Sequence, residues 1–326
     1  METQTQETMI QEQDSKRQVP ELSLLSYIEG GASDKTKFID ALFGGLKDYG
    51  FIILKDHIID QGKVDLAYEY VHEFFQLPEE TKLKYYNQEM AGQRGLTPFR
   101  REHAKDNPNP DLKEFWHVGR ELSAASQYKG VYPENIWPTE IPEFKKAFME
   151  LYSAMDATSI VLLEAIGVAL DVKPGFFKEM IHDGNSILRT IHYPPTKGQD
   201  TNNSIRAAAH EDINLITMLV GATSSGLQLL DRDGTWLDVN SKPGQVVVDT
   251  GDMMSRLTNN ILPATTHRVV NPDTDSERRY SMPYFVHPHS KAMLSCLDSC
   301  VGNGRKFDDI TAGDFLVQRL IEIGLM

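Results

Sequence analysis

The chain has 326 residues, of which 40% are hydrophobic and 25% are charged, and its formal net charge is −14. This size and composition are ordinary for a soluble globular protein with one large domain or two smaller ones. The acidic balance argues against nonspecific binding to nucleic acid or to an anionic membrane surface, although it does not exclude a small acidic ligand. Cys296 and Cys300 are too few for a disulfide scaffold and lack a second Cys/His pair for zinc, so we expect ordinary thiols.

The N-terminal segment 1–19 is polar and contains no apolar region of the signal-peptide type. No apolar run in the sequence reaches the ~18 residues that a membrane helix needs. We therefore expect a cytoplasmic protein with a short disordered tail over 1–19 and without a membrane partner.

From 20 to 185 the apolar residues recur mostly at helical spacing, which predicts a mostly helical region that packs on the core. The segment 79–141 is mixed, with loops near 92–98 and 107–110. The expected elements, in chain order, are a helix over Lys35–Tyr49, a strand over Phe51–Leu54, a helix over Asp60–Leu77 and a helix over Pro142–Asp171.

From 186 to 290 the pattern changes to short β-branched and apolar runs separated by turn residues, which is typical of a sandwich or barrel. A helix over Ala312–Ile323 is expected to close the last segment, 291–326. The predicted class is therefore mainly β, with flanking helices. The expected strands are Ile187–Tyr193, Asn214–Val220, Leu227–Leu230, Thr235–Val239, Gln245–Asp249, Thr266–Val270 and Tyr280–His287.

His210 and Asp212 lie two positions apart, just before an apolar run, in the sequence AAAHEDINLITM. On a strand these positions face the same side, and a buried carboxylate needs a partner. His267, 57 residues later in another expected strand, supplies a third donor. Two imidazoles and one carboxylate leave part of an octahedron open, as non-haem Fe(II) oxygenases require, and the same donors also suit catalytic zinc.

Arg279 and Ser281 repeat the two-residue spacing on a later expected strand. An arginine fork beside a hydroxyl is a good receptor for a carboxylate, because the guanidinium can bind both oxygens. An arginine that points into a core without such an anion would be costly. The pair therefore predicts a carboxylate-binding site.

These blocks, in their order along the chain, resemble the iron(II)- and 2-oxoglutarate-dependent dioxygenase family, in its isopenicillin N synthase-like branch. The resemblance covers nearly the whole chain from about 20 to 325. The blocks that carry it are His210-Glu211-Asp212 (similar to the HxD motif), Gly226-Leu227-Gln228-Leu229 with Trp236 (GLQ…W), Pro243-Gly244 through Asn260 (PG…GD…LTN), His267-Arg268-Val269 (HRV), Arg279-Tyr280-Ser281 (RxS) and Arg189 through Pro195 (RxxxYPP).

The resemblance implies a double-stranded β-helix (jelly-roll) core over 186–290 and Fe(II) held by His210, Asp212 and His267. It implies 2-oxoglutarate on the iron, with its distal carboxylate on Arg279 and Ser281, and O2 as the oxidant. Tyr193 matches a position that helps to hold the co-substrate or the substrate. The implied reaction oxidises a small molecule with release of succinate and CO2; hydroxylation is the default outcome, and desaturation or cyclisation are variants.

Other functions remain open at this point. Isopenicillin N synthase keeps the same triad and RxS without using 2-oxoglutarate, so Arg279 and Ser281 could instead hold a carboxylate of the substrate. A zinc hydrolase and a jelly-roll binding protein without catalysis are further alternatives. Arg94, Arg100 and Arg101 lie in the stretch GQRGLTPFRREH, and an anionic substrate is expected if any of them reaches the pocket.

Overall fold

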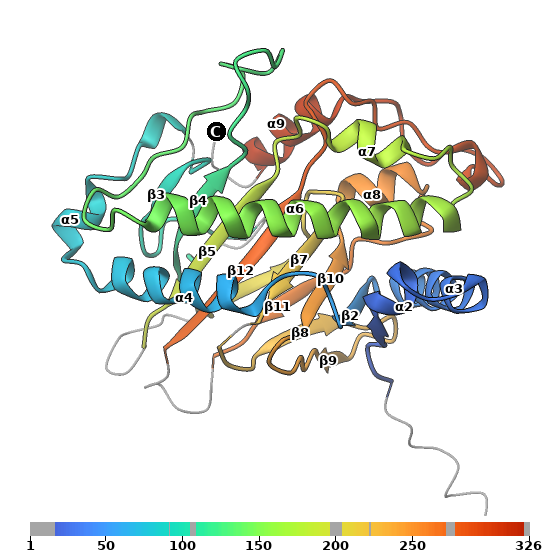
Figure 1. The fold of residues 1–326 in the computed structure, drawn as a ribbon, viewed down its shortest axis with the longest axis horizontal. Coiled ribbons are helices and arrows are strands. Elements are labelled where there is room, and N and C mark those ends of the chain that lie inside the picture. Colours follow the sequence, from blue (N-terminus) through green and yellow to red (C-terminus); the bar gives the residue numbers. More distant parts are fainter. Residues whose placement is uncertain are drawn as a thin grey trace, which may run out of the picture.

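The computed structural model describes residues 17–90, 92–104, 109–195, 204–221, 223–271 and 278–322, so most of the predicted tail lies outside the described residues. Figure 1 shows a large sheet with the long helix α6 across it. The described helices are α2 (Leu24–Ile28), α3 (Ala32–Tyr49), α4 (Gln61–Gln76), α5 (Glu79–Leu83), α6 (Phe144–Ala169), α7 (Phe176–Ile181), α8 (Asp252–Leu257) and α9 (Ala312–Glu322). The strands are β1 (Glu21–Ser23), β2 (Phe51–Lys55), β3 (Gly95–Thr97), β4 (Glu114–Gly119), β5 (Ile187–Tyr193), β6 (Ala207–His210), β7 (Ile216–Val220), β8 (Leu227–Leu230), β9 (Trp236–Asp238), β10 (Val246–Thr250), β11 (His267–Val269) and β12 (Arg279–Val286).

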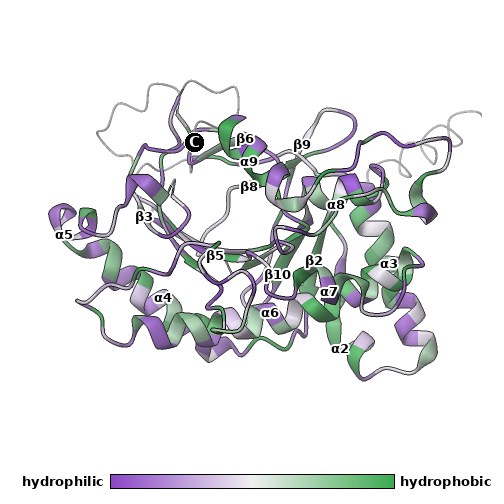
Figure 2. Cartoon of the chain, turned by 90° about the horizontal axis from the view of Figure 1, so that it is seen from above, coloured by the Kyte–Doolittle hydropathy of each residue, from purple (hydrophilic) through white to green (hydrophobic). Residues whose placement is uncertain are grey.

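The strands form two sheets. The larger sheet has the order β1-β2-β10-β7-β12-β5-β4-β3, and the smaller has the order β6-β11-β8-β9. Helices α4 and α6 lie along one side of the larger sheet, whereas β6, β8 and α9 lie on its other side (Figure 2). The two sheets form the double-stranded β-helix core that the sequence predicts, and helices cover its outer face.

The turn after α3 brings the N-terminal part of the chain to the core. Gly50 ends this helix at φ 68°, the left-handed conformation that glycine adopts most easily. A Cβ at this position would lie 2.1 Å from Oγ1 of Thr265, so a larger residue would collide with the segment before β11. The glycine therefore lets the chain pass close to Thr265 where β2 begins.

Helix α6 is the one described helix that is long and apolar enough to cross a membrane. However, 56% of its apolar window is buried inside the protein. It packs against α3, α4 and α7 and touches β12. These contacts make α6 a core helix of this fold.

Most predicted elements are present with shifted ends. The long helix begins at Phe144 rather than Pro142, which lies before its N-cap, and β7 begins at Ile216 rather than Asn214. The segment 79–141 contains β3 and β4, which the sequence did not predict. Every residue of β4 is buried, so its sequence lacks the alternation that marks a strand with one exposed face.

The regions divided at 20, 186 and 291 remain a proposed division of the chain. Strands from the first region are continuous with the core, because β2 pairs with β10 and β4 pairs with β5. The first region therefore completes the larger sheet in addition to covering it.

Candidate active site

A cavity of about 470 Å³ is lined by both sheets and by one side of α9. The strands β5 and β12 present alternate residues to it, as expected for positions that share a face of a sheet. The lining residues include Ile187, Arg189, Ile191 and Tyr193 from β5, and Arg279, Ser281, Pro283 and Phe285 from β12.

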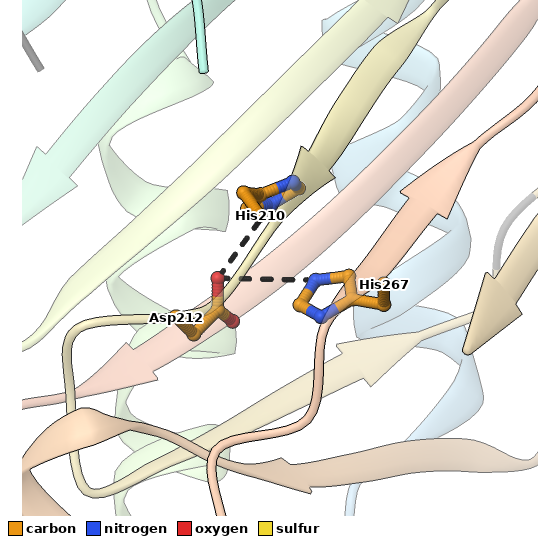
Figure 3. A group of neighbouring side chains, drawn as sticks. All are labelled: His210, Asp212 and His267. Atoms are coloured by element: carbon orange, nitrogen blue, oxygen red, sulfur yellow. Dashed lines mark ion pairs between the residues drawn. The ribbon is translucent and has the colours of Figure 1, made fainter. Parts of the chain in front are cut away.

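His210, Asp212 and His267 meet in this cavity (Figure 3). His210 ends β6 and lies opposite His267, which begins β11. Nε2 of His210 lies 3.8 Å and Nε2 of His267 lies 3.9 Å from Oδ1 of Asp212. The potential ligand atoms of the three residues all lie within 4.8 Å of one another.

The route by which Asp212 reaches this point differs from the prediction. Asp212 was expected on one strand with His210, two positions along, but β6 ends at His210 and Asp212 lies in the following loop. The loop is held by the backbone of α8, because the N–H of Asp252 donates to the carbonyl of Asp212 at 2.8 Å. A loop contact rather than strand alternation therefore positions the carboxylate.

Backbone carbonyls fix the orientation of both imidazoles. Nδ1 of His210 lies 2.7 Å from the carbonyl oxygen of Ala208, and Nδ1 of His267 lies 3.1 Å from that of Thr265. A carbonyl only accepts, so each Nδ1 is assigned the proton and each Nε2 keeps a free lone pair. This is the tautomer in which an imidazole binds a metal through Nε2.

Asp212 is oriented from its other oxygen. The hydroxyl of Thr217 donates to Oδ2 of Asp212, and Nδ2 of Asn214 donates to Oγ1 of Thr217 at 2.9 Å. These bonds leave Oδ1 directed at the two imidazoles. Burial opposes the charge of Asp212, but His267 and His210 outweigh it and lower the pKa of this carboxyl.

Electrostatics favour the ligand form of His210 as well. Burial, followed by the neighbouring His267, lowers the pKa of His210 to about 4, so its imidazole is neutral at pH 7. Close by, Asp249 is buried, and burial together with the charge of Asp212 raises its pKa well above the ordinary range. The site therefore holds a charged carboxylate, Asp212, beside the neutral imidazole of His210.

Arg279 and Ser281 lie together at one end of the cavity floor. Nη1 of Arg279 lies 3.2 Å from Oγ of Ser281, and Nε donates to the carbonyl of Ser224 at 3.2 Å. The guanidinium carbon lies 4.9 Å from the ring centroid of Tyr193, the residue opposite Arg279 on β5. In the described part of the chain no carboxylate pairs with Arg279, although it is only 1% exposed.

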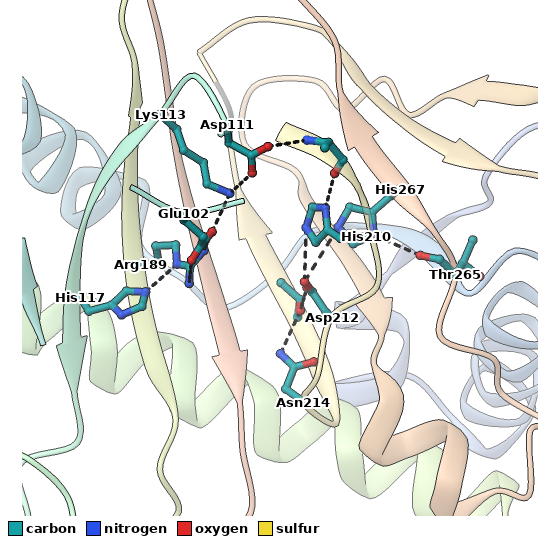
Figure 4. Close-up of polar contacts among 12 residues, drawn as sticks. Glu102, Asp111, Lys113, His117, Arg189, His210, Asp212, Asn214, Thr265 and His267 are labelled. Carbon is teal, nitrogen blue, oxygen red and sulfur yellow. Dashed lines mark hydrogen bonds and ion pairs between the residues drawn. The ribbon is translucent and has the colours of Figure 1, made fainter. Parts of the chain in front are cut away.

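A second charged group, which the sequence did not reveal, lines the cavity opposite the metal-ligand candidates (Figure 4). We call Glu102, Asp111, Lys113, His117 and Arg189 the Arg189 cluster. Nζ of Lys113 lies 2.8 Å from Oε1 of Glu102 and 2.8 Å from Oδ2 of Asp111. Nη1 and Nη2 of Arg189 lie 3.3 and 3.5 Å from the two oxygens of Glu102.

The arginines that the sequence suggested for substrate contact lie elsewhere. Arg94 is fully buried away from the cavity, where it donates to the carbonyl of Gln93 at 2.6 Å and to Oδ1 of Asn185 at 3.2 Å. Arg100 and Arg101 are exposed, and neither lines the cavity. Arg189, which the sequence placed only within a strand motif, lines the cavity in their place.

The donor set fits a divalent iron ion. Two imidazole nitrogens and one carboxylate oxygen point to a common position, and the cavity beside them leaves room for further ligands. Tetrahedral structural zinc would need a fourth protein ligand. Among the described residues, the group of potential ligands contains only these three.

Comparisons with known proteins agree with this geometry. Residues 184–288 match the family model described as the 2OG-Fe(II) oxygenase superfamily, and residues 19–140 match the model described as non-haem dioxygenase in morphine synthesis N-terminal. The 2-oxoglutarate-Fe(II) type oxidoreductase hxnY of Emericella nidulans is 30% identical over 86% of this chain and 83% of its own.

Solved structures extend the similarity. A protein assigned to the 2OG-Fe(II) oxygenase family from Caulobacter crescentus is 44% identical, with a TM-score of 0.84 over 93% of this chain and 98% of its own. A full-length Neurospora crassa protein, solved with 2-oxoglutarate (alpha-KG), is 28% identical, with a TM-score of 0.83 over 94% of this chain and 97% of its own. These relatives do not favour the alternative of an oxidase that works without 2-oxoglutarate. The chain belongs to the 2OG-Fe(II) oxygenase superfamily and is a non-haem, Fe(II)- and 2-oxoglutarate-dependent oxygenase that uses O2.

Proposed function

We propose that His210, Asp212 and His267 hold the Fe(II) of this oxygenase. The observation that carries the proposal is the convergence of two imidazole nitrogens and one carboxylate oxygen within 4.8 Å in the cavity. The backbone carbonyls behind both Nδ1 atoms and the Thr217 hydroxyl behind Asp212 support it, because such outer contacts hold ligands in orientation.

Arg279 and Ser281 bind the distal carboxylate of 2-oxoglutarate in this proposal. A buried guanidinium without a described carboxylate partner needs an anion, and a hydroxyl beside it adds a second donor. The ring of Tyr193 packs against the guanidinium and keeps its plane fixed. The other end of 2-oxoglutarate then faces the metal-ligand candidates across the cavity.

Bound Fe(II), with 2-oxoglutarate and O2, supplies the oxidation, in which 2-oxoglutarate is converted to succinate and CO2. The chain contributes orientation and a partly enclosed cavity that limits access of water. The substrate is a small molecule, since the cavity measures about 470 Å³. Hydroxylation is the proposed outcome, and desaturation or cyclisation are its variants.

The Neurospora crassa relative was also solved with 2-oxoglutarate and thymine, and with 2-oxoglutarate and 5-formyluracil. Both compounds are therefore reasonable first members of a substrate screen for this chain. The predicted anionic substrate depended on Arg94, Arg100 or Arg101 and has lost that support. A cytoplasmic location and the absence of nucleic-acid and membrane partners stay predictions from the sequence.

The proposal is tested by anaerobic titration of the metal-free protein with Fe(II) and then 2-oxoglutarate. We expect the visible charge-transfer band of the iron chelate, and its loss in Asp212→Ala, because the removed carboxylate is the only charged protein ligand. Asp238→Ala, at the exposed end of β9, is the matched control and should keep the band. Full retention of the band in Asp212→Ala would refute the assignment of the ligands.

A further inference from the structure

The Arg189 cluster is built around balanced charge, unlike the surroundings of Arg279. It contains two cations, Arg189 and Lys113, and two carboxylates, Glu102 and Asp111. Burial opposes the charge of Glu102, but Arg189 and Lys113 outweigh it and hold its pKa well below the usual range. Both carboxylates and both cations therefore face the cavity with no net charge.

The position of Arg189 is fixed on several sides. Its guanidinium carbon lies 4.1 Å from the ring centroid of Phe115 and 5.1 Å from that of Phe285. Its Nε donates to Nε2 of His117, whose Nδ1 in turn lies 2.6 Å from the carbonyl oxygen of Gly92. Burial, followed by the charge of Arg189, lowers the pKa of His117 well below its usual value, so this ring accepts and carries no charge.

The cluster keeps hydrogen-bonding capacity after these contacts. A guanidinium has five N–H donors, and the contacts with His117 and Glu102 leave one N–H on each terminal nitrogen of Arg189 without a partner among the described residues. Among the described residues, the 3.5 Å contact from Arg189 is the single hydrogen bond that Oε2 of Glu102 receives, so this oxygen can accept another. A donor and an acceptor thus lie side by side on the cavity wall.

The Arg189 cluster and the proposed 2-oxoglutarate site at Arg279 lie apart along the same pair of strands. Arg189 lies four residues before Tyr193 on β5, which corresponds to about 13 Å of strand at ~3.3 Å per residue. Ile191 and Ser281 face each other between them. The metal-ligand candidates lie across the cavity, so a ligand at Arg189 and 2-oxoglutarate at Arg279 can both reach the iron position.

We propose that the Arg189 cluster recognises an uncharged carboxamide or ring-amide group of the substrate. Arg189 donates to its carbonyl oxygen and Glu102 accepts from its N–H. A carboxylate at the same position would place a further negative charge beside Glu102 and leave the charge-balanced cluster with an unpaired buried charge, which is costly. This inference rests on the proposed function, because it concerns the substrate half of the same cavity.

The test uses pairs of compounds in which a carboxamide replaces a carboxylate on a frame that has no other amide: benzamide and benzoate, and 2-furamide and 2-furoate. The protein is loaded anaerobically with Fe(II) and saturating 2-oxoglutarate, so that the Arg279 end is already filled. Dissociation constants are measured by calorimetry in wild type, Glu102→Gln, Arg189→Met and the exposed control Glu134→Gln.

We expect the amide to bind more tightly than its acid in wild type and in Glu134→Gln. In Glu102→Gln, loss of one negative charge should shift the amide-to-acid affinity ratio toward the acid by about tenfold. Arg189→Met should weaken binding of the amides by about tenfold while the 2-oxoglutarate chelate band persists, which shows that the variant is folded. Tighter binding of the acids to wild type, an unchanged ratio in Glu102→Gln, or failure of every amide to bind would overturn the inference.

The chelate band recorded before any probe is added tests the proposed function separately. If that band is absent, the assignment of the iron and 2-oxoglutarate sites fails. The same pairs titrated into the metal-free protein then still report on the amide preference of the Arg189 cluster.

Discussion

Arg279 and Arg189 lie on adjacent strands, face the same cavity and are both held against aromatic rings, yet their surroundings differ. Arg279 has a hydroxyl and a carbonyl beside it and no described carboxylate, whereas Arg189 is paired with Glu102. The charge left over after local pairing therefore decides what each arginine can bind. One end of the cavity suits an anion, and the other suits a neutral polar group.

Replacing each arginine in turn is the most direct test of whether the two ends of the cavity bind different groups. Arg279→Met should raise the dissociation constant of 2-oxoglutarate about 100-fold, because charge-assisted hydrogen bonds contribute roughly 1.5–3 kcal/mol. Arg189→Met should leave that constant within about twofold, since its guanidinium is already paired. Anaerobic calorimetry measures both, with the exposed Arg305→Met as the control. Equal losses in the two cavity variants would contradict the division of the cavity.

Ser281→Ala tests how much the hydroxyl beside Arg279 contributes to the affinity for 2-oxoglutarate. Loss of the hydroxyl removes one hydrogen bond to the carboxylate but leaves the guanidinium, so we expect a roughly 5- to 10-fold weaker affinity for 2-oxoglutarate, or about 1 kcal/mol. The same titration measures it, and Ser153→Ala on the exposed side of α6 is a suitable control. An effect as large as that of Arg279→Met would show that the serine also orients the arginine.

The last prediction concerns the pH dependence of the free energy of unfolding, which the ion pairs of Glu102 at the Arg189 end of the cavity should affect. The pKa of Glu102 is lower in the folded chain than in the unfolded chain, so its ion pairs stabilise the fold above the ordinary glutamate pKa. This contribution is lost as the pH falls below about 5 toward the folded pKa. Urea unfolding should show wild type more stable than Glu102→Gln at pH 7, by a margin that is smaller at pH 4. A difference that does not shrink at pH 4 would exclude this ion pairing as its source.

The sequence predicted the metal-ligand candidates because residue type and order carried the signal. His210, Asp212 and His267 were found as donors near apolar runs, and Arg279 with Ser281 by their spacing. The fold class followed from the change of period near 186 and from the resemblance. The structure corrected the path to Asp212, which lies beyond the strand.

The Arg189 cluster could not be predicted in the same way. Glu102, Lys113 and Arg189 come from segments without common spacing, and strand pairing brings His117 opposite Arg189. The strand β4, which supplies this contact, is buried on both faces. Its sequence therefore lacks the alternation of polar and apolar residues that would have predicted a strand. Conversely, Arg94, Arg100 and Arg101 form a noticeable basic group in the sequence but have no common location in the fold.

The larger sheet contains strands from both the N-terminal region and the core, which limits where the chain can be cut into separate fragments. β10 pairs with β2 on one side, and β5 pairs with β4 on the other, so both partners precede residue 184. A recombinant fragment restricted to 184–288 would expose two unpaired strand edges, which are sites of intermolecular pairing. We expect such a fragment to self-associate. Exchange of substrate preference between relatives is therefore better engineered through cavity side chains than by swapping halves of the gene.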